Sequence, residues 1–303
     1  MRKLSINLLL ILALAGLLLI SCQQSAETGK ATVGAVVDSV ASADGVMIKY
    51  EVRGKGEPAL IFVHGWSCDR SYWKNQVNEF GKTYKIVTID MGGHGGSGLE
   101  RDVWSVQAFG ADVAAVVNKL NLEKVVLIGH SMAGAVNMEA AKLLSDRVVG
   151  LIGVDTYQQF HNGVPPQKLA EILAPFRDDF VKTADGFVRV MFVENTDSVL
   201  VNWIVSDMSA APPKVAIGAL ESYFSCNTLQ MLNETSVPIY TINSDLWPTD
   251  LEANQKNAVF FEMKLMPGVG HFIMLEDHVT FNKLLHETLD ELTCKSNAPV
   301  DKE

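Results

Sequence analysis

The stretch VVLIGHSMAG at residues 125–134 decides the fold of this chain. Four apolar residues lead into Gly129, and a helical pattern starts at Met132, directly after Ser131. A short apolar run bounded by glycine is typical of a buried strand. The small residues Gly129 and Ala133 allow the strand and the following helix to approach closely. The stretch therefore predicts a serine hydroxyl that projects from a sharp strand-to-helix turn.

Short apolar runs and longer helical patterns alternate on both sides of this turn. Residues 46–52 alternate in period two, which predicts an edge hairpin strand. Further strands, expected to be buried, lie at residues 59–63, 84–89, 125–128, 148–154, 239–242 and 259–265. Helices are expected near residues 72–80, 105–120, 132–144 and 279–292. This alternation predicts an α/β fold, a mostly parallel sheet with helices on both faces.

Residues 157–236 interrupt the alternation, because no strand stands out between them. Helices are expected there at residues 168–176, 180–192, 198–208 and 215–224. We interpret this block as a helical lid inserted between two sheet strands. A separate domain is the alternative, but neither end of the block carries a long linker. The expected division is a core of residues 36–156 and 237–296 with a lid of residues 157–236.

Three motifs occur in the chain order of one enzyme superfamily. Gly-His-Ser-Met-Ala at residues 129–133 resembles the nucleophile elbow Gly-x-Ser-x-Gly of the α/β-hydrolase superfamily, with Ala133 in place of the final glycine. His-Gly-Trp at residues 64–66 resembles its oxyanion loop, and Gly-His-Phe at residues 270–272 resembles its catalytic-histidine loop. The resemblance covers about residues 40–293 and implies the α/β-hydrolase fold.

The resemblance also implies a role for each motif. Ser131 would be the nucleophile, and His271 the base that takes its proton. The backbone amides of Trp66 and Met132 would form the oxyanion hole. His64 would organise its loop rather than react. Glu276, just downstream of the histidine, is expected to belong to a solvated charged cluster.

Three aspartates compete for the role of the acid that orients His271. Asp245 lies nearest to the end of the strand at residues 239–242 and is the first choice. Asp250 in the same loop is the second, and Asp155, at the end of the preceding sheet strand, is the third. The superfamily's common Gly-x-x-Asp spacing is absent after residues 239–242, so the sequence leaves the choice open.

A glycine-rich turn at residues 90–97 fits two patterns. It resembles the Asp-x-x-Gly-His-Gly-x-Ser turn of the same superfamily. Gly93, Gly95 and Gly98 also satisfy the dinucleotide-binding pattern Gly-x-Gly-x-x-Gly. That site needs a helix that opens at the glycines and an acidic residue after a second strand. Residues 99–104 intervene before the helix here, and the next strand ends in the serine turn, which disfavours a nucleotide site.

The resemblance is strongest to the monomeric esterase and non-heme perhydrolase branch. It implies a serine hydrolase that cleaves a small or medium carboxylic ester through an acyl-enzyme. A C–C bond hydrolase, a lactonase or a perhydrolase on the same triad is an alternative. A catalytically silent surface-binding lipoprotein is the alternative of another class, which the presence of Ser131 and His271 disfavours. No metal or organic cofactor is implied, and a monomer is expected.

Composition excludes other classes of protein. The chain has 303 residues with a net charge of −10, which disfavours nucleic acid as a partner because phosphate contacts need Lys and Arg. It is 48% hydrophobic and 20% charged, as expected of a globular protein. Beside Cys22, the cysteines Cys68, Cys226 and Cys294 allow one disulfide at most and show no zinc-ligand spacing.

The N-terminus predicts export. A basic start precedes an unbroken apolar run at residues 8–20, which spans roughly 20 Å as a helix and falls short of a bilayer core of roughly 30 Å. This predicts a signal peptide over residues 1–21. Leu-Ile-Ser-Cys at residues 19–22 resembles the bacterial lipobox, which implies lipid modification of Cys22. Residues 22–35 would then form a polar tether. The protein would be a lipoprotein anchored to a membrane and facing the periplasm or the cell exterior. An ordinary secretory signal is the alternative.

Overall fold

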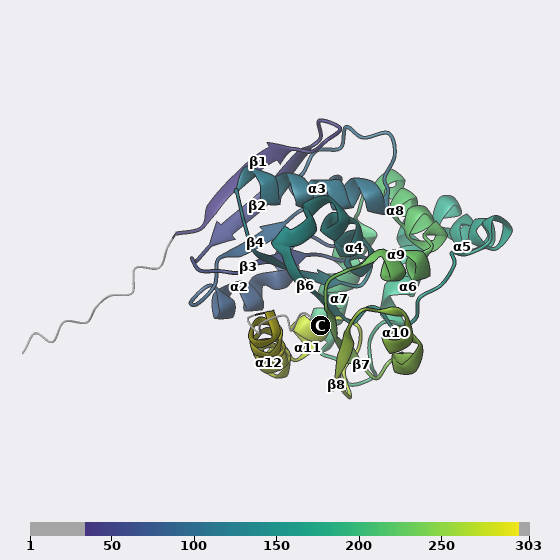
Figure 1. The fold of residues 1–303 in the computed structure, drawn as a ribbon. Helices are drawn as coiled ribbons and strands as arrows, with labels where there is room; N and C mark the ends of the chain where they lie inside the picture. The colour runs from purple at the N-terminus through teal and green to yellow at the C-terminus, as the bar shows by residue number, and fades with distance from the viewer. Residues whose placement is uncertain (1–33, 297–303) are drawn as a thin grey trace, which may run out of the picture. The chain divides into compact units, whose positions relative to one another are not determined.

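Residues 34–296, which the computed structural model describes, contain an eight-stranded sheet (Figure 1). The signal peptide, Cys22 and most of the tether expected from the sequence lie outside these residues. The strand order is β1-β2-β4-β3-β5-β6-β7-β8. The strands are β1 (Val36–Ala41), β2 (Met47–Arg53), β3 (Ala59–Val63), β4 (Ile86–Ile89), β5 (Val125–His130), β6 (Val148–Val154), β7 (Ile239–Ser244) and β8 (Phe261–Met266).

The sheet is parallel from β4 to β8, and β2 pairs antiparallel with both β1 and β4. Every residue of β3, β4 and β5 is buried, as expected of parallel strands covered on both faces. The expected α/β fold with a mostly parallel sheet is confirmed. The expectation that residues 46–52 form an edge strand is wrong, because β1 pairs on the outer side of β2. Four of the six β1 residues are exposed, so the sequence carries no core-facing pattern there.

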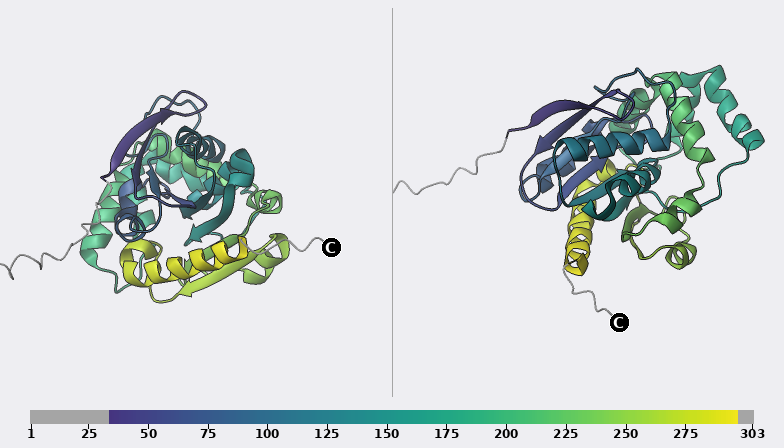
Figure 2. Two further views of the ribbon diagram at one scale, coloured as in Figure 1. Left: turned by 60° about the vertical axis from the view of Figure 1, so that its left-hand side comes forward. Right: turned by 45° about the horizontal axis from the view of Figure 1, so that its top comes forward.

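Four helices cover the sheet. They are α2 (Lys74–Phe80), α3 (Val106–Lys119), α4 (Ala133–Leu144) and α12 (His278–Ser296). In the two views of Figure 2, α12 lies along β8 near the C-terminal end of the described residues. Helices α3 and α4 pack against each other, and α2 packs against α12. The Ser105 side chain caps α3 by accepting from the Ala108 backbone N–H at 3.1 Å, which explains where the expected helix begins.

Helices alone connect β6 to β7 within the described part of the chain. They are α5 (Pro166–Asp178), α6 (Phe180–Arg189), α7 (Ser198–Ser209), α8 (Pro213–Ser225) and α9 (Thr228–Glu234). Prolines open α5 and α8, where a missing N–H costs nothing. Figure 1 shows these helices gathered at one end of the sheet. We call residues 157–236 the helical insert; its role as a lid stays a prediction.

Three shorter helices were not expected from the sequence. They are α9, described above, α10 (Leu251–Asn257) and α11 (Ile273–Glu276). None of the helices in residues 34–296 combines the length and the apolar content needed to cross a membrane. The thiols of Cys68, Cys226 and Cys294 are free.

Candidate active site

Ser131 occupies the turn between β5 and α4. Its φ of +55° is a conformation that costs a residue with a side chain about 1 to 3 kcal/mol. Two backbone hydrogen bonds hold the turn: Ser131 N–H donates to the Val154 carbonyl at 3.1 Å, and Gly134 N–H donates to the Ser131 carbonyl at 2.9 Å. A Cβ at Gly129 would lie 2.5 Å from the Asn137 side chain, so the close approach of strand and helix requires glycine there.

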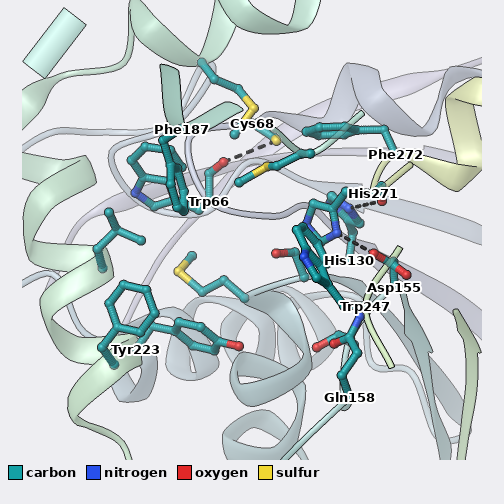
Figure 3. Close-up of a pocket in the computed structure, with 17 residues that line it drawn as sticks. Trp66, Cys68, His130, Asp155, Gln158, Phe187, Tyr223, Trp247, His271 and Phe272 are labelled. Carbon is teal, nitrogen blue, oxygen red and sulfur yellow. Dashed lines mark hydrogen bonds and ion pairs between the residues drawn. The ribbon is translucent and has the colours of Figure 1, made fainter. Parts of the chain in front are cut away.

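Ser131 lines a cavity of about 220 Å³. We call it the main cavity, and Figure 3 shows residues that line it. His271 and Asp155 line the same cavity. The Ser131 hydroxyl makes no hydrogen bond with another side chain or backbone group of residues 34–296. It is therefore available to a molecule that enters the cavity.

Contacts with three residues orient His271. Its Nδ1–H donates to Asp155 Oδ2 at 2.5 Å, and its backbone N–H donates to the Met191 carbonyl at 2.7 Å. The His130 ring lies 4.5 Å from its ring, and His130 Nε2–H donates to its carbonyl at 3.0 Å. Because Asp155 occupies Nδ1, Nε2 is the ring nitrogen left to act as a base toward Ser131.

Asp155 is fully buried and held on both carboxylate oxygens. Oδ2 accepts from His271, and Oδ1 accepts from the Ser244 backbone N–H at 2.7 Å. Its own N–H donates to the Ile242 carbonyl at 2.8 Å. The carboxylate is thus fixed at the carboxyl ends of β6 and β7, facing the imidazole.

The expectation that Asp245 faces His271 is corrected, since Asp155 occupies that position. Asp245 Oδ1 instead accepts from the Gly268 backbone N–H at 2.8 Å, three residues before the histidine. Asp250 caps α10 by accepting from the Ala253 N–H at 3.1 Å. The loop after β7 runs outward to these positions, whereas Asp155 follows β6 directly and stays over the sheet.

Strand register explains the position of Asp155. His130 pairs with Val154, so Ser131 and Asp155 are the first residues after two neighbouring parallel strands. The carboxyl ends of parallel strands meet at one edge of a sheet, where sites form. The sequence signal was available: if residues 125–130 and 148–154 are taken as neighbouring parallel strands, Asp155 lies beside Ser131.

Trp66 and Met132 line the main cavity with Ser131. Within the described residues, neither backbone N–H donates a hydrogen bond to the protein. Met132 stands at the N-terminal end of α4, where the helix dipole favours negative charge. The indole N–H of Trp66 donates to the Ala216 carbonyl of α8 at 2.8 Å, which fixes the loop after β3 against the helical insert. The two amides are therefore free to receive an oxyanion.

His64 bridges two loops rather than facing the cavity. Its Nε2 accepts from the Met91 N–H at 3.0 Å, and its Nδ1–H donates to the Gly65 carbonyl at 2.8 Å. The ring must be neutral to make both bonds, and burial lowers its pKa to about 4. His94 packs 4.9 Å away, and burial lowers its pKa to about 3. Both rings therefore stabilise the loops after β3 and β4 and remain uncharged.

We expect acid to destabilise the protein through these two histidines. In the unfolded chain both rings take up protons below pH 6.5, whereas in the folded chain they stay neutral down to about pH 4 and pH 3. The free energy of unfolding should therefore fall as pH drops from 7 to 5, by about 2 kcal/mol for each ring. Urea titrations at both pH values measure this loss.

The comparison with two variants isolates the effect. His94→Asn should lose about 2 kcal/mol less than the wild type between pH 7 and 5, because one buried titrating ring is gone. His278→Gln, which removes an exposed ring at the start of α12, should lose as much as the wild type. If the wild type and His94→Asn lose the same free energy of unfolding between pH 7 and 5, His94 does not contribute to the acid destabilisation.

Glu276 holds the histidine loop, which the sequence did not suggest. Its carboxylate accepts from the N–H groups of Gly270 at 2.9 Å and Phe272 at 3.0 Å, on either side of His271. It also accepts from the hydroxyl of Thr196 in the helical insert at 2.8 Å. The expected solvated cluster is therefore wrong for Glu276. No local pattern marks this role, because its donors are backbone groups.

Most of the main cavity is apolar. Trp66, Phe187 and Phe272 are among its aromatic walls (Figure 3), and the insert contributes further side chains, namely Met191, Met208, Leu220 and Phe224. Among residues 34–296, no three His, Cys, Asp or Glu side chains are arranged to hold a metal ion. The cavity can therefore take an apolar group next to Ser131.

The chain is similar to known proteins of one family. Residues 60–284 match the model of the "Alpha/beta hydrolase family". The karrikin insensitive 2 receptor CA of Petunia hybrida is 23% identical over 205 residues, which are 64% of this chain and 76% of the receptor. The pimeloyl-[acyl-carrier protein] methyl ester esterase of Yersinia enterocolitica is 23% identical over 249 residues, 78% of this chain and 95% of the esterase.

The fold is shared with solved structures. A thermophilic esterase from Thermogutta terrifontis superposes with a TM-score of 0.74 at 23% identity. The match covers 85% of this chain and 99% of that esterase.

Proposed function

Because the chain belongs to the alpha/beta hydrolase family, whose relatives here include esterases, we propose that it is a serine hydrolase acting on small or medium carboxylic esters. One observation carries the proposal: Ser131, the His271–Asp155 pair at 2.5 Å and the two free amides of Trp66 and Met132 surround one cavity. These are the groups that two-step acyl transfer needs.

In the first step Ser131 Oγ attacks the ester carbonyl carbon while His271 Nε2 takes the hydroxyl proton. The carbonyl oxygen becomes negative and is stabilised by the N–H groups of Trp66 and Met132. The C–O bond to the alcohol then breaks, and His271 returns the proton to the leaving alkoxide. Asp155 stabilises the imidazolium that forms between these events.

In the second step water attacks the acyl-enzyme. His271 takes a proton from the water, and a second tetrahedral oxyanion occupies the same two amides. When it collapses, the bond from the acyl carbon to Ser131 Oγ breaks and His271 returns the proton to the serine. The products are a carboxylic acid and the free enzyme.

The size and lining of the main cavity support a medium apolar acyl or aryl group. A cavity of about 150 Å³ lined by apolar residues accepts benzene, so about 220 Å³ accommodates a somewhat larger group. Each buried methylene contributes about 0.8 kcal/mol until the cavity is full. Affinity should therefore rise with acyl length and then stop rising.

A series of p-nitrophenyl esters from acetate to palmitate tests the function. We expect kcat/KM to peak between about four and eight acyl carbons, because longer chains leave the cavity. Ser131→Ala serves as the control for hydrolysis outside the site. A maximum at twelve carbons or more, or equal hydrolysis by Ser131→Ala, would contradict the proposal.

Related chemistries use the same groups. Lactonase, C–C bond hydrolase and perhydrolase reactions could run on Ser131, His271 and Asp155, and no contact in the main cavity favours one of them over ester hydrolysis. A silent binding role is disfavoured because the elements of the site are all present.

Export is a separate proposal that rests on the N-terminal sequence. A signal peptide over residues 1–21 and a lipid-modified Cys22 would place the hydrolase on a membrane, outside the cytoplasm. Its substrates would then be small esters in that compartment.

A further inference from the structure

We propose that the substrate carries a second, uncharged hydrogen-bond acceptor, such as a carbonyl oxygen, and that Tyr223 and Gln158 bind it. This deepens the proposed function and rests on it. The two side chains line the same cavity as Ser131 and His271. They come from separate elements, Tyr223 from α8 and Gln158 from the loop that follows Asp155.

The other polar side chains around the cavity are mostly committed to the protein. The indole of Trp66 donates to Ala216, the thiol of Cys68 donates to the Trp66 carbonyl at 3.3 Å, and His130 donates to His271. By contrast, the Tyr223 hydroxyl and the Gln158 side-chain amide make no hydrogen bond within residues 34–296. Neither polar group is fully enclosed by the protein, and both side chains line the cavity.

The position of the pair divides the cavity. Figure 3 shows Trp66 and Phe187 on one side and Tyr223 and Gln158 on the other, with Trp247 between Gln158 and His271. One side therefore presents aromatic rings to a bound molecule, and the other presents side-chain hydrogen-bonding groups to it. A plain hydrocarbon ester would leave these groups unmatched.

The chemistry of the pair selects a neutral acceptor. Burial raises the pKa of Tyr223, so its phenol stays protonated and donates. The Gln158 amide provides two more N–H donors. No Lys or Arg of the described chain lines the cavity, while the Asp155 carboxylate does. An anionic group on the substrate would therefore be buried without a cation, which is costly.

Two matched ester pairs test the inference. In p-nitrophenyl pentanoate and p-nitrophenyl 4-oxopentanoate, a carbonyl replaces a methylene of the acyl chain. Pentyl acetate and 4-oxopentyl acetate make the same exchange in the alcohol. The readout is the ratio of kcat/KM between the oxo ester and its hydrocarbon partner, compared between enzyme variants, because intrinsic reactivity then cancels.

For at least one pair, Tyr223→Phe should lower this ratio about tenfold, and Gln158→Leu should lower it as well. Tyr84→Phe is the matched control, since its phenol is half-buried just before β4 and does not line the cavity. This control should keep the wild-type ratio. If both variants keep the wild-type ratio for both ester pairs, the inference is overturned. Tyr223 and Gln158 would then contact water and not the substrate.

Failure of the proposed function would look different. A wild type that hydrolyses none of the four esters would refute the serine-hydrolase proposal. In that case a binding measurement tests the inference without hydrolysis. Calorimetry with 2-heptanone should give a dissociation constant about tenfold weaker for Tyr223→Phe than for the wild type, and equal constants would overturn it.

Discussion

Ser131→Ala is expected to lower kcat/KM for ester hydrolysis on the order of 10⁴-fold or more, the scale on which a removed nucleophile acts. The alanine has no oxygen to form the acyl-enzyme, and the remaining groups can only bind the ester and polarise its carbonyl. The same change should abolish covalent labelling by a fluorophosphonate probe, which reports the nucleophile without any assumption about the substrate. Labelling is read by mass spectrometry of the intact protein.

Ser67→Ala is the matched control for this experiment. Ser67 and Ser131 both have a φ of +55° and belong to loops at the same end of the sheet. Only Ser131 lines the main cavity. Ser67→Ala should therefore keep fluorophosphonate labelling. A wild type that the probe does not label, or a labelled Ser131→Ala, would remove the serine-hydrolase proposal.

The helical insert builds part of the site as well as covering it. The Met191 carbonyl accepts from the His271 backbone, and the Thr196 hydroxyl donates to the Glu276 carboxylate that holds both neighbours of His271. On the opposite side of the cavity, the Ala216 carbonyl fixes the Trp66 indole. A displacement of the insert would therefore move the base and one oxyanion donor together. This explains how a segment without strands contributes to a site at the edge of the sheet.

The sequence predicted well the features that local pattern encodes. Strands such as β3 and β5 are uninterrupted apolar runs, and Ser131 stands between small residues at the end of one of them. The β1 strand (Val36–Ala41) is not among the strands that the sequence predicts. Its apolar residues are mostly exposed at the sheet edge, so they carry no periodic burial signal.

Long-range geometry accounts for the features that the sequence left undetermined. Three aspartates were candidates because spacing along the chain does not tell which loop turns inward. The pairing of β5 with β6 decides it, since it places Asp155 beside Ser131. The role of Glu276 was not predicted for a related reason. A carboxylate that accepts from backbone N–H groups has no sequence pattern that distinguishes it from a surface carboxylate.

Asp155→Asn is expected to lower kcat about 10³- to 10⁴-fold with the fold retained. The asparagine oxygen can replace Oδ1 as the acceptor for the Ser244 N–H, which directs the amide NH₂ at His271 Nδ1. Nδ1 must then accept a hydrogen bond, and the ring proton moves to Nε2. In this tautomer Nε2 has no lone pair for the Ser131 proton, so the base is lost while the shape of the site is preserved.

Asp245→Asn and Asp250→Asn separate this explanation from the first choice made on sequence. An asparagine oxygen can still accept from the Gly268 N–H at position 245 and from the Ala253 N–H at position 250. Both variants should therefore keep kcat within about threefold of the wild type, because Asn caps a helix as well as Asp does. Steady-state kinetics on p-nitrophenyl butyrate, with thermal unfolding to confirm folding, compares the three. A large loss in Asp245→Asn together with a small one in Asp155→Asn would return the role to the loop after β7, and the 2.5 Å contact of Asp155 with His271 would then be structural only.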